Sequence, residues 1–403
     1  MSTCSPSEGN RPSVEVADIF RDHLHELGSI GPEQWKVVNA LISCRTARLG
    51  GHLYACDHCG QTLTAYNSCR NRHCPKCQAA ARAKWLDERM DELLPVEYFH
   101  LVFTIPDVLN HLVLVNKAVL YEILFRAAKE TLLQSATNPK NLGARVGFLA
   151  ILHTWGQNLL DHPHLHCLVP GGGLSSDGTR WISCRKGFFV SVKILSALFR
   201  GKFLDFLKNA YQNKQLQFPG QTSLFESWEA FQKLLNRAYA KHWVVYAKKP
   251  FAGPEQVLRY LGRYTHRVAI SNHRIIDVRD GIVRFRWKDY KHANAWKIMS
   301  VSTAEFMRRF LLYVLPTGFM RIRPYGLLSN RNKNQNLAVC RNLLCDSSET
   351  EQSESQGLSS AQPTATTETA ILCPNCHHGH LVSVMIIEPE LFDPGKTKRL
   401  DSS

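Results

Sequence analysis

Two pairs of cysteines stand at the spacing of zinc knuckles. Cys56 and Cys59 form the first pair, and Cys74 and Cys77 form the second pair further along the chain. A structural zinc ion accepts four ligands in a tetrahedron, and a gap of two residues lets both thiolates of one turn reach the same metal. We therefore expect these four cysteines to hold one structural zinc ion. The competing interpretation, a redox pair or unliganded thiols, requires two such pairs to coincide by chance.

Further potential ligands alternate with these pairs, namely Cys44, His52, Cys69 and His73. Their types suit a second zinc site, in which the three-residue gap between Cys69 and His73 supplies the closer pair. The alternative is that they are small buried residues and surface imidazoles. Lysines and arginines surround this stretch, so a folded zinc module here is most simply an element that docks on DNA.

A third set of cysteines lies near the end of the sequence, at Cys340, Cys345, Cys373 and Cys376. The stretch from Asp346 to Ala370 contains eleven Ser or Thr, five acidic residues and no Lys or Arg. Such a composition cannot bury enough apolar surface to order itself, so we expect a disordered linker. A zinc site closed across this linker remains an open alternative, with the histidines after Cys376 as competing ligands.

The sequence His164-Leu165-His166 lies on a predicted strand. Alternate side chains of a strand face the same way, so both imidazoles point to one side and Leu165 packs behind them. Two imidazoles suit a divalent cation, which also needs a third protein ligand and open positions for substrate oxygens. A single pair of this kind in a chain with 18 histidines is more often structural or exposed.

Tyr260 and Tyr264 lie four residues apart on a predicted helix, which stacks their hydroxyl groups on one face. A neighbouring basic stripe at the same spacing, Arg259, Arg263 and Arg267, would hold phosphates beside them. A tyrosine pair at this spacing is by itself more often part of a half-buried core.

The composition limits the class of protein. The 403 residues include 49 Lys and Arg against 34 Asp and Glu, a net charge of +15 that favours a polyanionic partner such as nucleic acid. With 44% hydrophobic residues, the chain can bury a substantial core. No apolar run is long enough to span a membrane, and the first residues do not resemble a signal peptide, so we expect no membrane association.

Strands and helices alternate through the middle of the chain. Continuous apolar runs predict strands at 98–105, 147–155 and 164–169, and helical spacing predicts long helices at 112–134 and 192–212. The sequence Arg279-Asp280-Gly281 between two strand-like runs is a hairpin signal. This mixture predicts an α+β fold.

Four strings occur in the order typical of one known family, and they cover roughly residues 30 to 335. They are CRNRHCPKCQ at 69–78, HTWGQNLLDHPHLHCLVPGGGL at 153–174, YLGRYTHRVAIS at 260–271 and LPTGFMRIRPYGLLSN at 315–330. In these strings the chain resembles transposases of the insertion sequence 91 family. The resemblance implies a rolling-circle enzyme with a two-tyrosine HUH (His-hydrophobic-His) nuclease domain. The implied fold is an antiparallel sheet flanked by helices, preceded by a small helical zinc-binding domain.

The resemblance also implies roles for matching residues. His164 and His166 correspond to the ligands of the catalytic metal, and Tyr260 and Tyr264 correspond to the two nucleophiles. An amide or carboxylate preceding the histidine pair often serves as the third ligand in this superfamily, so Gln157 is the expected residue. The remaining candidates for this position are His153 and His162.

The implied chemistry is metal-assisted DNA cleavage. Magnesium or manganese would polarise the scissile phosphate, and phenolate attack would give a 5′-phosphotyrosine bond and a free 3′-OH. Strand joining then needs no ATP, in keeping with the absence of a GxxxxGK[ST] loop from the sequence. The residues expected to bind DNA are Arg259, Arg263, Arg267, Arg284 and Arg286.

The expected partners are single-stranded DNA and the ends of the protein's own mobile element, with the host replication machinery as a further partner. The expected location is the bacterial cytoplasm, associated with the nucleoid. The expected division is an N-terminal helical segment (1–43), a zinc-binding domain with its trailing helix (44–95), the HUH nuclease domain (96–330) and a tail (331–403) that includes the linker 346–370.

Two other functions fit much of the same sequence. A plasmid or phage replication initiator, or a conjugative relaxase, would use the same chemistry on another replicon. A zinc-dependent DNA-binding protein without catalysis would need neither the histidine pair nor the tyrosine pair.

Overall fold

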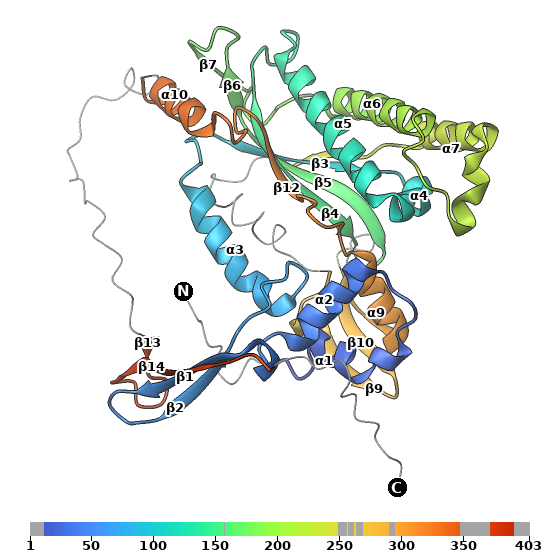
Figure 1. Ribbon diagram of the computed structural model, residues 1–403. Helices are drawn as coiled ribbons and strands as arrows, with labels where there is room; N and C mark the ends of the chain where they lie inside the picture. Colours follow the sequence, from blue (N-terminus) through green and yellow to red (C-terminus); the bar gives the residue numbers. More distant parts are fainter. Residues whose placement is uncertain are drawn as a thin grey trace.

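The computed structural model describes residues 12–156, 158–248, 256, 262, 269–289, 295–346 and 371–390. Figure 1 shows a large sheet with a layer of helices on one side, a smaller unit of helices and strands below it, and a long hairpin that extends away from both. The sheets are antiparallel and helices flank them, which confirms the predicted α+β class.

The large sheet contains five antiparallel strands. In spatial order they are β12 (Ile322–Gly326), β4 (Gly147–Trp155), β5 (Asp161–Pro170), β3 (Tyr98–Thr104) and β8 (Val245–Lys248). The predicted strands at 98–105, 147–155 and 164–169 are therefore neighbours at the centre of this sheet. Central strands are buried on both faces, which explains why their sequences are almost continuously apolar.

Helices cover one face of this sheet (Figure 1). They are α4 (Asn110–Val115), α5 (Lys117–Thr137), α6 (Val192–Gln212) and α7 (Trp228–Ala240). Alternate side chains of β3, β4 and β5, including Phe103, Leu152 and Leu165, enter the hydrophobic core beneath these helices. The predicted long helices thus supply the main core of the protein.

The opposite face packs against α3 (Pro75–Met90). Leu149, Ile151 and Leu168 are buried on this face, and Trp85 and Leu86 of α3 pack against them. The residues of β4 and β5 that do not enter the main core are therefore directed toward α3.

A second core joins both halves of the sequence. It combines α1 (Val16–Asp22) and α2 (Pro32–Ser43) with α9 (Thr303–Leu312) and with a sheet of order β11-β10-β9. The strands of this sheet are β9 (Ile275–Arg279), β10 (Ile282–Asp289) and β11 (Ala295–Ser302). The predicted division set residues 1–43 apart as a separate segment, whereas the structure packs their helices into one core with residues 269–314.

The predicted hairpin at Arg279-Asp280-Gly281 is confirmed. It joins β9 to β10, and Asp280 and Gly281 have φ values of 49° and 69°. Two successive residues with positive φ are typical of the type I′ turn, whose twist matches that of the flanking strands.

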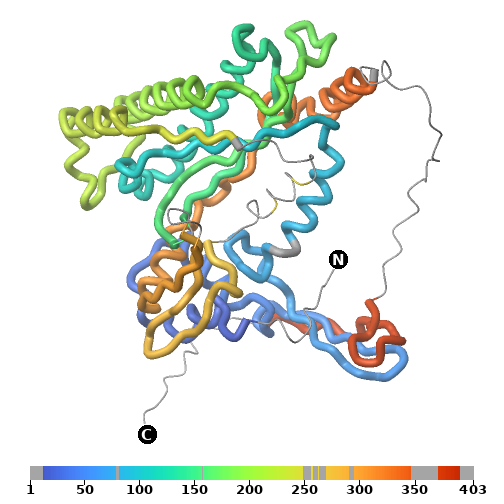
Figure 2. Tube along the Cα trace, turned by 180° about the vertical axis from the view of Figure 1, so that it is seen from behind, coloured from blue at the N-terminus to red at the C-terminus, as the bar shows by residue number. Residues whose placement is uncertain are grey.

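The protruding hairpin is part of a sheet of order β13-β14-β1-β2. Its strands are β1 (Gly51–Cys56), β2 (Thr62–Tyr66), β13 (Ile371–Leu372) and β14 (His380–Ile387). Figure 2, seen from behind, shows the blue N-terminal hairpin beside the red C-terminal strands. Segments more than 300 residues apart thus share one sheet.

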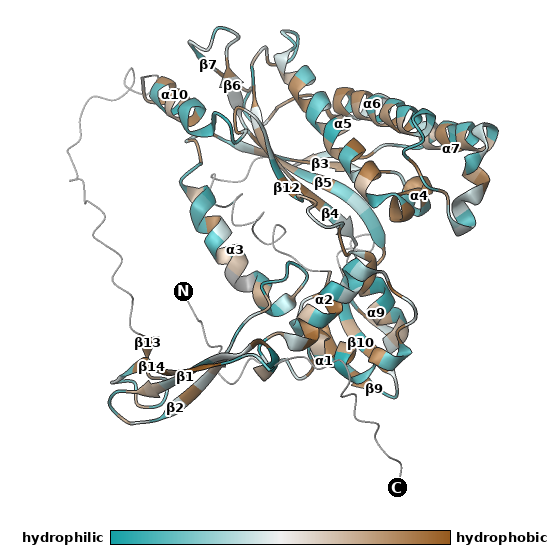
Figure 3. Cartoon of the chain, viewed as in Figure 1, coloured by the Kyte–Doolittle hydropathy of each residue, from teal (hydrophilic) through white to brown (hydrophobic). Residues whose placement is uncertain are grey.

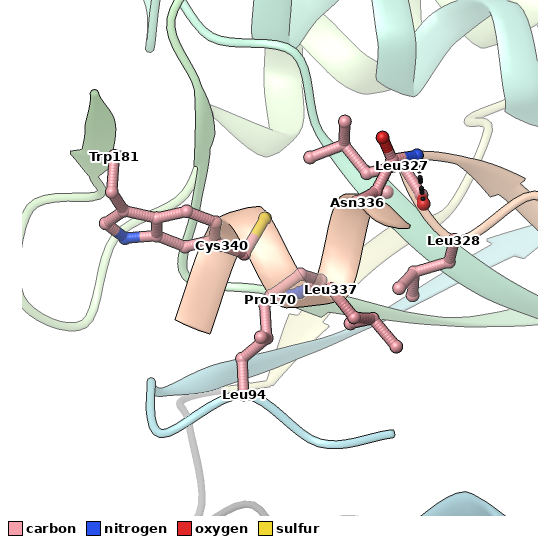
Figure 4. A pocket seen from close by; sticks show the side chains of 9 residues that line it. Leu94, Pro170, Trp181, Leu327, Leu328, Asn336, Leu337 and Cys340 are labelled. Carbon is pink, nitrogen blue, oxygen red and sulfur yellow. Dashed lines mark hydrogen bonds between the residues drawn. The ribbon is translucent and has the colours of Figure 1, made fainter. Parts of the chain in front are cut away.

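The helix α10 (Lys333–Asp346) packs near β6 (Gly172–Leu174) and β7 (Trp181–Ser183). Cys340 of this helix points into a small apolar pocket beside Trp181 and Leu337 (Figure 4). Cys373 and Cys376 lie far from it, since they group with Cys56 and Cys59 at the protruding hairpin. The suggested zinc set that combined Cys340 and Cys345 with the last two cysteines is therefore wrong.

Short 3₁₀ helices complete the described chain, at η2 (Leu24–Glu26), η3 (Ala47–Leu49), η4 (Asp107–Leu109), η5 (Gly220–Glu226) and η6 (Asn272–Arg274). Figure 3 shows hydrophilic and hydrophobic residues mixed on the long helices. Within the described residues, no helix combines the length and the apolar character needed to cross a bilayer.

We predict that Phe20→Ala destabilises the smaller unit. Phe20 is fully buried in α1, and its ring lies 5.5 Å from that of Phe310 in α9. Removal of a buried phenyl ring should cost about 3 to 5 kcal/mol of unfolding free energy, measurable by urea denaturation. Leu224→Ala is the control, since Leu224 is exposed. Equal stability of the two variants would contradict a core shared between α1 and α9.

Candidate metal centre and nucleic-acid interface

Three histidines converge on the α3 side of the large sheet. His153 comes from β4, and His164 and His166 come from β5. The two strands pair so that His153 lies directly opposite His164, and His166 follows on the same face. One side-chain nitrogen from each of the three lies within 4.8 Å of the others. The group is therefore compact enough to hold one metal ion.

Hydrogen bonds fix the orientation of two of these rings. Nδ1 of His164 lies 2.6 Å from the backbone oxygen of His162, and Nδ1 of His166 lies 2.7 Å from Nε2 of His100. A proton on each Nδ1 leaves Nε2 with a lone pair for a metal. Outer contacts of this kind set the tautomer and direction of metal-binding imidazoles.

His100 is a residue that sequence reasoning missed. It lies on β3, is buried, and stacks nearly parallel to His166 with ring centroids 5.0 Å apart. The signal was present in the alternation of β3, where Phe99 and Leu101 enter the main core and His100 must face the other way. Because His100 is buried on the same face as the histidine pair, it can orient His166 through the contact between their rings.

Burial keeps His164 and His166 neutral. It lowers the pKa of His164 to about 3, and neighbouring His162 and His100 lower it further in smaller measure. Burial also lowers the pKa of His166 well below its ordinary value, with His153 as the largest neighbouring contribution. A neutral imidazole has the free lone pair that coordination requires, so the group is prepared for a cation at neutral pH.

The other residues expected around this site have different outcomes. The expected third ligand, Gln157, lies outside the described residues, while His153, a remaining candidate, joins the histidine pair. His162 contributes its backbone oxygen to His164.

The two tyrosines, Tyr260 and Tyr264, and the basic stripe Arg259, Arg263 and Arg267 also lie outside the described residues. Gly262, between the tyrosines, is described and buried. A Cβ atom at Gly262 would lie 2.5 Å from Cδ2 of Leu86, so its backbone packs closely against α3.

The predicted grouping of the cysteines is wrong. Cys44, Cys69, Cys74 and Cys77 form one cluster, whereas Cys56 and Cys59 meet Cys373 and Cys376 in another. In the first cluster, Sγ of Cys77 lies 3.6 Å from Sγ of Cys44 and of Cys69. Four thiolates about 2.3 Å from a tetrahedral zinc ion lie about 3.8 Å from one another. The sulfur atoms therefore already have the spacing of a zinc site.

Local structure explains the first cluster. Cys44 caps the end of α2, Cys74 caps the start of α3, and Cys77 lies in the first turn of α3. Cys56 instead ends β1, which carries it away from α3 along the hairpin. The knuckles were correctly recognised as local units, but the fold assigns them to different partners.

The two histidines of the suggested second zinc set do not belong to either cluster. His52 lies on β1 near Tyr54, with ring centroids 6.1 Å apart. Burial lowers the pKa of His73 to about 3, and Arg72 and Arg321 lower it further. Both described clusters consist of four cysteines, so neither includes His52 or His73.

Cations and an exposed aromatic ring share the open face of the β11-β10-β9 sheet. Arg286 is exposed and pairs with Ile298, and Lys288 pairs with Trp296 on the neighbouring strand. Trp296 is 64% exposed. Arg284, the other arginine expected to bind DNA, donates two hydrogen bonds to Asp277, so its charge is largely offset within the sheet.

Comparison with known proteins identifies the family. The family model described as "Transposase zinc-binding domain" matches residues 16–105, and that described as "Putative transposase" matches residues 147–336. The chain is 51% identical over 389 residues to "Putative transposase y4qJ" of Sinorhizobium fredii, which covers 95% of this chain and 96% of that relative. The chain belongs to the insertion sequence 91 family of transposases.

A second relative supports this assignment. The transposase for insertion sequence element IS801 of Pseudomonas savastanoi pv. phaseolicola is 30% identical over 332 residues, which cover 81% of this chain and 78% of the relative. The protein is therefore a transposase of this type, with a zinc-binding domain and a general activity of cutting and joining DNA strands.

Solved structures add little. A conjugative relaxase, TrwC, in metal-bound complex with OriT DNA is 14% identical and matches over 63% of this chain and 95% of that chain, with a TM-score of 0.24.

We predict that His100 positions a metal ligand in the transposase. His100→Phe removes the hydrogen bond to Nδ1 of His166 and should weaken the binding of added Mn²⁺ by about 10- to 100-fold, as measured by isothermal titration calorimetry. His100→Gln keeps an acceptor for that nitrogen and should recover most of the affinity. Unchanged binding in His100→Phe, with the fold intact by circular dichroism, would show that the contact is structural only.

Proposed function

We propose that this transposase cleaves and rejoins single-stranded DNA through tyrosine nucleophiles beside a metal held by His153, His164 and His166. One observation supports this most directly. Gly262, flanked at two residues by Tyr260 and Tyr264, packs on Leu86 of α3, and Leu86 also packs against the sheet face that carries the histidines. Gly262 and the sheet face that carries the histidines therefore contact the same helix.

The donor set indicates which ion the site would hold. Magnesium prefers oxygen ligands, whereas imidazole nitrogen suits first-row transition ions. Because the described group consists of three imidazoles, the transition ion manganese fits better than magnesium. When bound, such an ion would polarise the scissile phosphate and offset charge on the leaving oxygen.

The residues of the chain would supply the rest of the reaction. A tyrosine phenol gives up its proton to solvent, and its oxygen attacks the phosphorus as the bond to the 3′ oxygen breaks; the leaving 3′ oxygen takes up a proton from solvent. This gives a 5′-phosphotyrosine and a free 3′-OH, which retains the energy of the phosphodiester for rejoining. With two tyrosines, one can hold the first cleaved strand while the other attacks a second strand. Arg259, Arg263 and Arg267 would bind the flanking phosphates.

The β11-β10-β9 sheet is suited to single-stranded DNA. An exposed tryptophan offers a surface on which a base can stack, and nearby cations attract the backbone. Trp296 and Arg286 have these properties, whereas Phe285, next to Arg286 on β10, is fully buried. Stacking needs an unpaired base, so this surface favours single strands over duplex.

The family assignment indicates on which kind of DNA element the protein acts. The same chemistry would serve a replication initiator or a relaxase, but relatives along most of the chain are transposases of insertion sequences. The expected substrates are therefore the ends of the protein's own element, cleaved at the nucleoid in the cytoplasm with help from the host replication machinery.

We predict that Tyr260→Phe/Tyr264→Phe abolishes the covalent protein–DNA adduct. The protein is incubated with Mn²⁺ and a labelled single-stranded oligonucleotide that carries the element's end, and the adduct is resolved by denaturing electrophoresis. Tyr239→Phe is the matched control and should form as much adduct as the wild type, since exposed Tyr239 on α7 lies in the helical layer behind the sheet. An adduct that persists in the double variant would refute the tyrosine assignment, and adduct formation by none of the proteins would favour a non-catalytic zinc protein.

We predict that Trp296→Ala weakens binding of single-stranded DNA. Loss of one stacked base costs about 1 to 3 kcal/mol, or roughly a 5- to 150-fold rise in Kd, measurable by fluorescence anisotropy. Trp228→Ala on α7 is the control, since Trp228 is also exposed but lies on another unit. Equal affinity of both variants would exclude Trp296 as a stacking platform.

A further inference from the structure

We propose that Cys56, Cys59, Cys373 and Cys376 bind a second zinc ion that fastens the C-terminal segment 371–390 to the N-terminal hairpin. The matched zinc-binding segment ends at residue 105, so two of these ligands lie far beyond it. The inference is independent of the nuclease chemistry proposed above.

The sulfur atoms have the spacing that zinc requires. Sγ of Cys56 lies 3.7 Å from Sγ of Cys376, and Sγ of Cys59 lies 3.8 Å from Sγ of Cys373. The edge of a tetrahedron of thiolates about 2.3 Å from zinc is about 3.8 Å. A disulfide would bring two sulfurs to about 2.05 Å. The arrangement therefore fits four thiolates around one ion and does not fit two disulfides.

Backbone N–H groups point at the sulfur atoms, as they do where thiolates carry charge. The N–H groups of His58 and Cys59 each donate to Sγ of Cys56 at 3.4 Å, and that of Gly379 donates to Sγ of Cys376 at the same distance. Hydrogen bonds to sulfur stabilise the thiolate that metal binding requires. Both CxxC turns thus have the local geometry of a metal knuckle.

The backbone at Gly379, beside the second knuckle, approaches the first knuckle closely. A Cβ atom at Gly379 would lie 2.6 Å from Sγ of Cys56 and 2.5 Å from Cβ of His58. The backbone of His380 also exchanges hydrogen bonds with Asp57, through its N–H to the carboxylate and its oxygen to the N–H. Glycine is therefore required at position 379 by the close approach of the first knuckle.

Strand pairing continues the attachment but buries little apolar surface. β14 pairs with β1 from Gly51↔Ile387 to Cys56↔Leu381. Most of the side chains of β14 remain exposed, including Val384 and Ile386. Because hydrophobic burial is small, pairing alone would hold the strand weakly, and a metal that joins the two ends supplies the missing stability.

Zinc content tests the ligand set. We expect Cys373→Ala/Cys376→Ala and Cys56→Ala/Cys59→Ala each to lose one zinc equivalent per chain relative to the wild type, measured by inductively coupled plasma mass spectrometry. The matched control Cys340→Ala/Cys345→Ala should lose none. A wild-type zinc content in the first two variants, or an equal loss in the control, would overturn the proposal.

A second experiment leaves the cysteines unchanged and does not depend on whether the variants fold. A protease site is placed within residues 347–370, the protein is cut, and the C-terminal fragment is followed by size-exclusion chromatography. The fragment should elute with the body, separate after treatment with a chelator, and return when zinc alone is added. The proposed zinc site would be contradicted if the fragment separated from the body in the presence of zinc. It would also be contradicted if the fragment stayed bound after chelation.

Failure of this proposal and failure of the proposed function are distinguishable. The covalent adduct depends on the tyrosines and the histidine group, whereas zinc content and fragment release depend on the four cysteines. If no adduct forms but the C-terminal fragment stays attached in a zinc-dependent way, only the nuclease chemistry is refuted. If the adduct forms but attachment of the fragment does not depend on zinc, only the second zinc site is refuted.

Discussion

The register between β4 and β5 is the constraint on which the rest of the site depends. Leu165 enters the core beneath the helices, so His164 and His166 must face the other side, where His153 lies opposite His164. A slip of one residue would exchange the two faces and bury the imidazoles under α5. Leu165, between the two histidines, is therefore as important for the site as the histidines themselves, because its burial fixes the direction of the imidazoles.

The helix α3 connects the zinc module to this face. Its first turn carries Cys77 of the first cysteine cluster, and its later turns place Trp85 and Leu86 against the sheet. Arg72, just before the helix, donates hydrogen bonds to backbone oxygens of residues 315–319, which lead into β12. The cysteine cluster thus sets the position of a helix that covers the histidine face, which gives a structural zinc ion an indirect influence on the histidine group.

The sequence predicts the local elements of the site correctly, but it does not predict which of these elements contact one another. The strand that carries His164 and His166, the turn at Asp280-Gly281 and the CxxC knuckles follow from spacing alone. Which knuckle meets which depends on tertiary structure: β14 adds to β1 although more than 300 residues separate them. No local rule reveals such a pairing, and nearness in the sequence instead favoured Cys340 and Cys345 as partners of the C-terminal cysteines. His100 was missed for a related reason, since its role appears only once β3 is placed beside β5.

The electrostatics of the histidine face follow from burial more than from charge. His164 and His166 have lowered pKa values, so they add no positive charge near neutral pH. A site of neutral imidazoles neither repels nor attracts a phosphate strongly. The attraction for DNA must then come from a cation held by the imidazoles and from the basic surface around the site. Because the imidazoles are neutral, protons do not compete with the ion for their lone pairs.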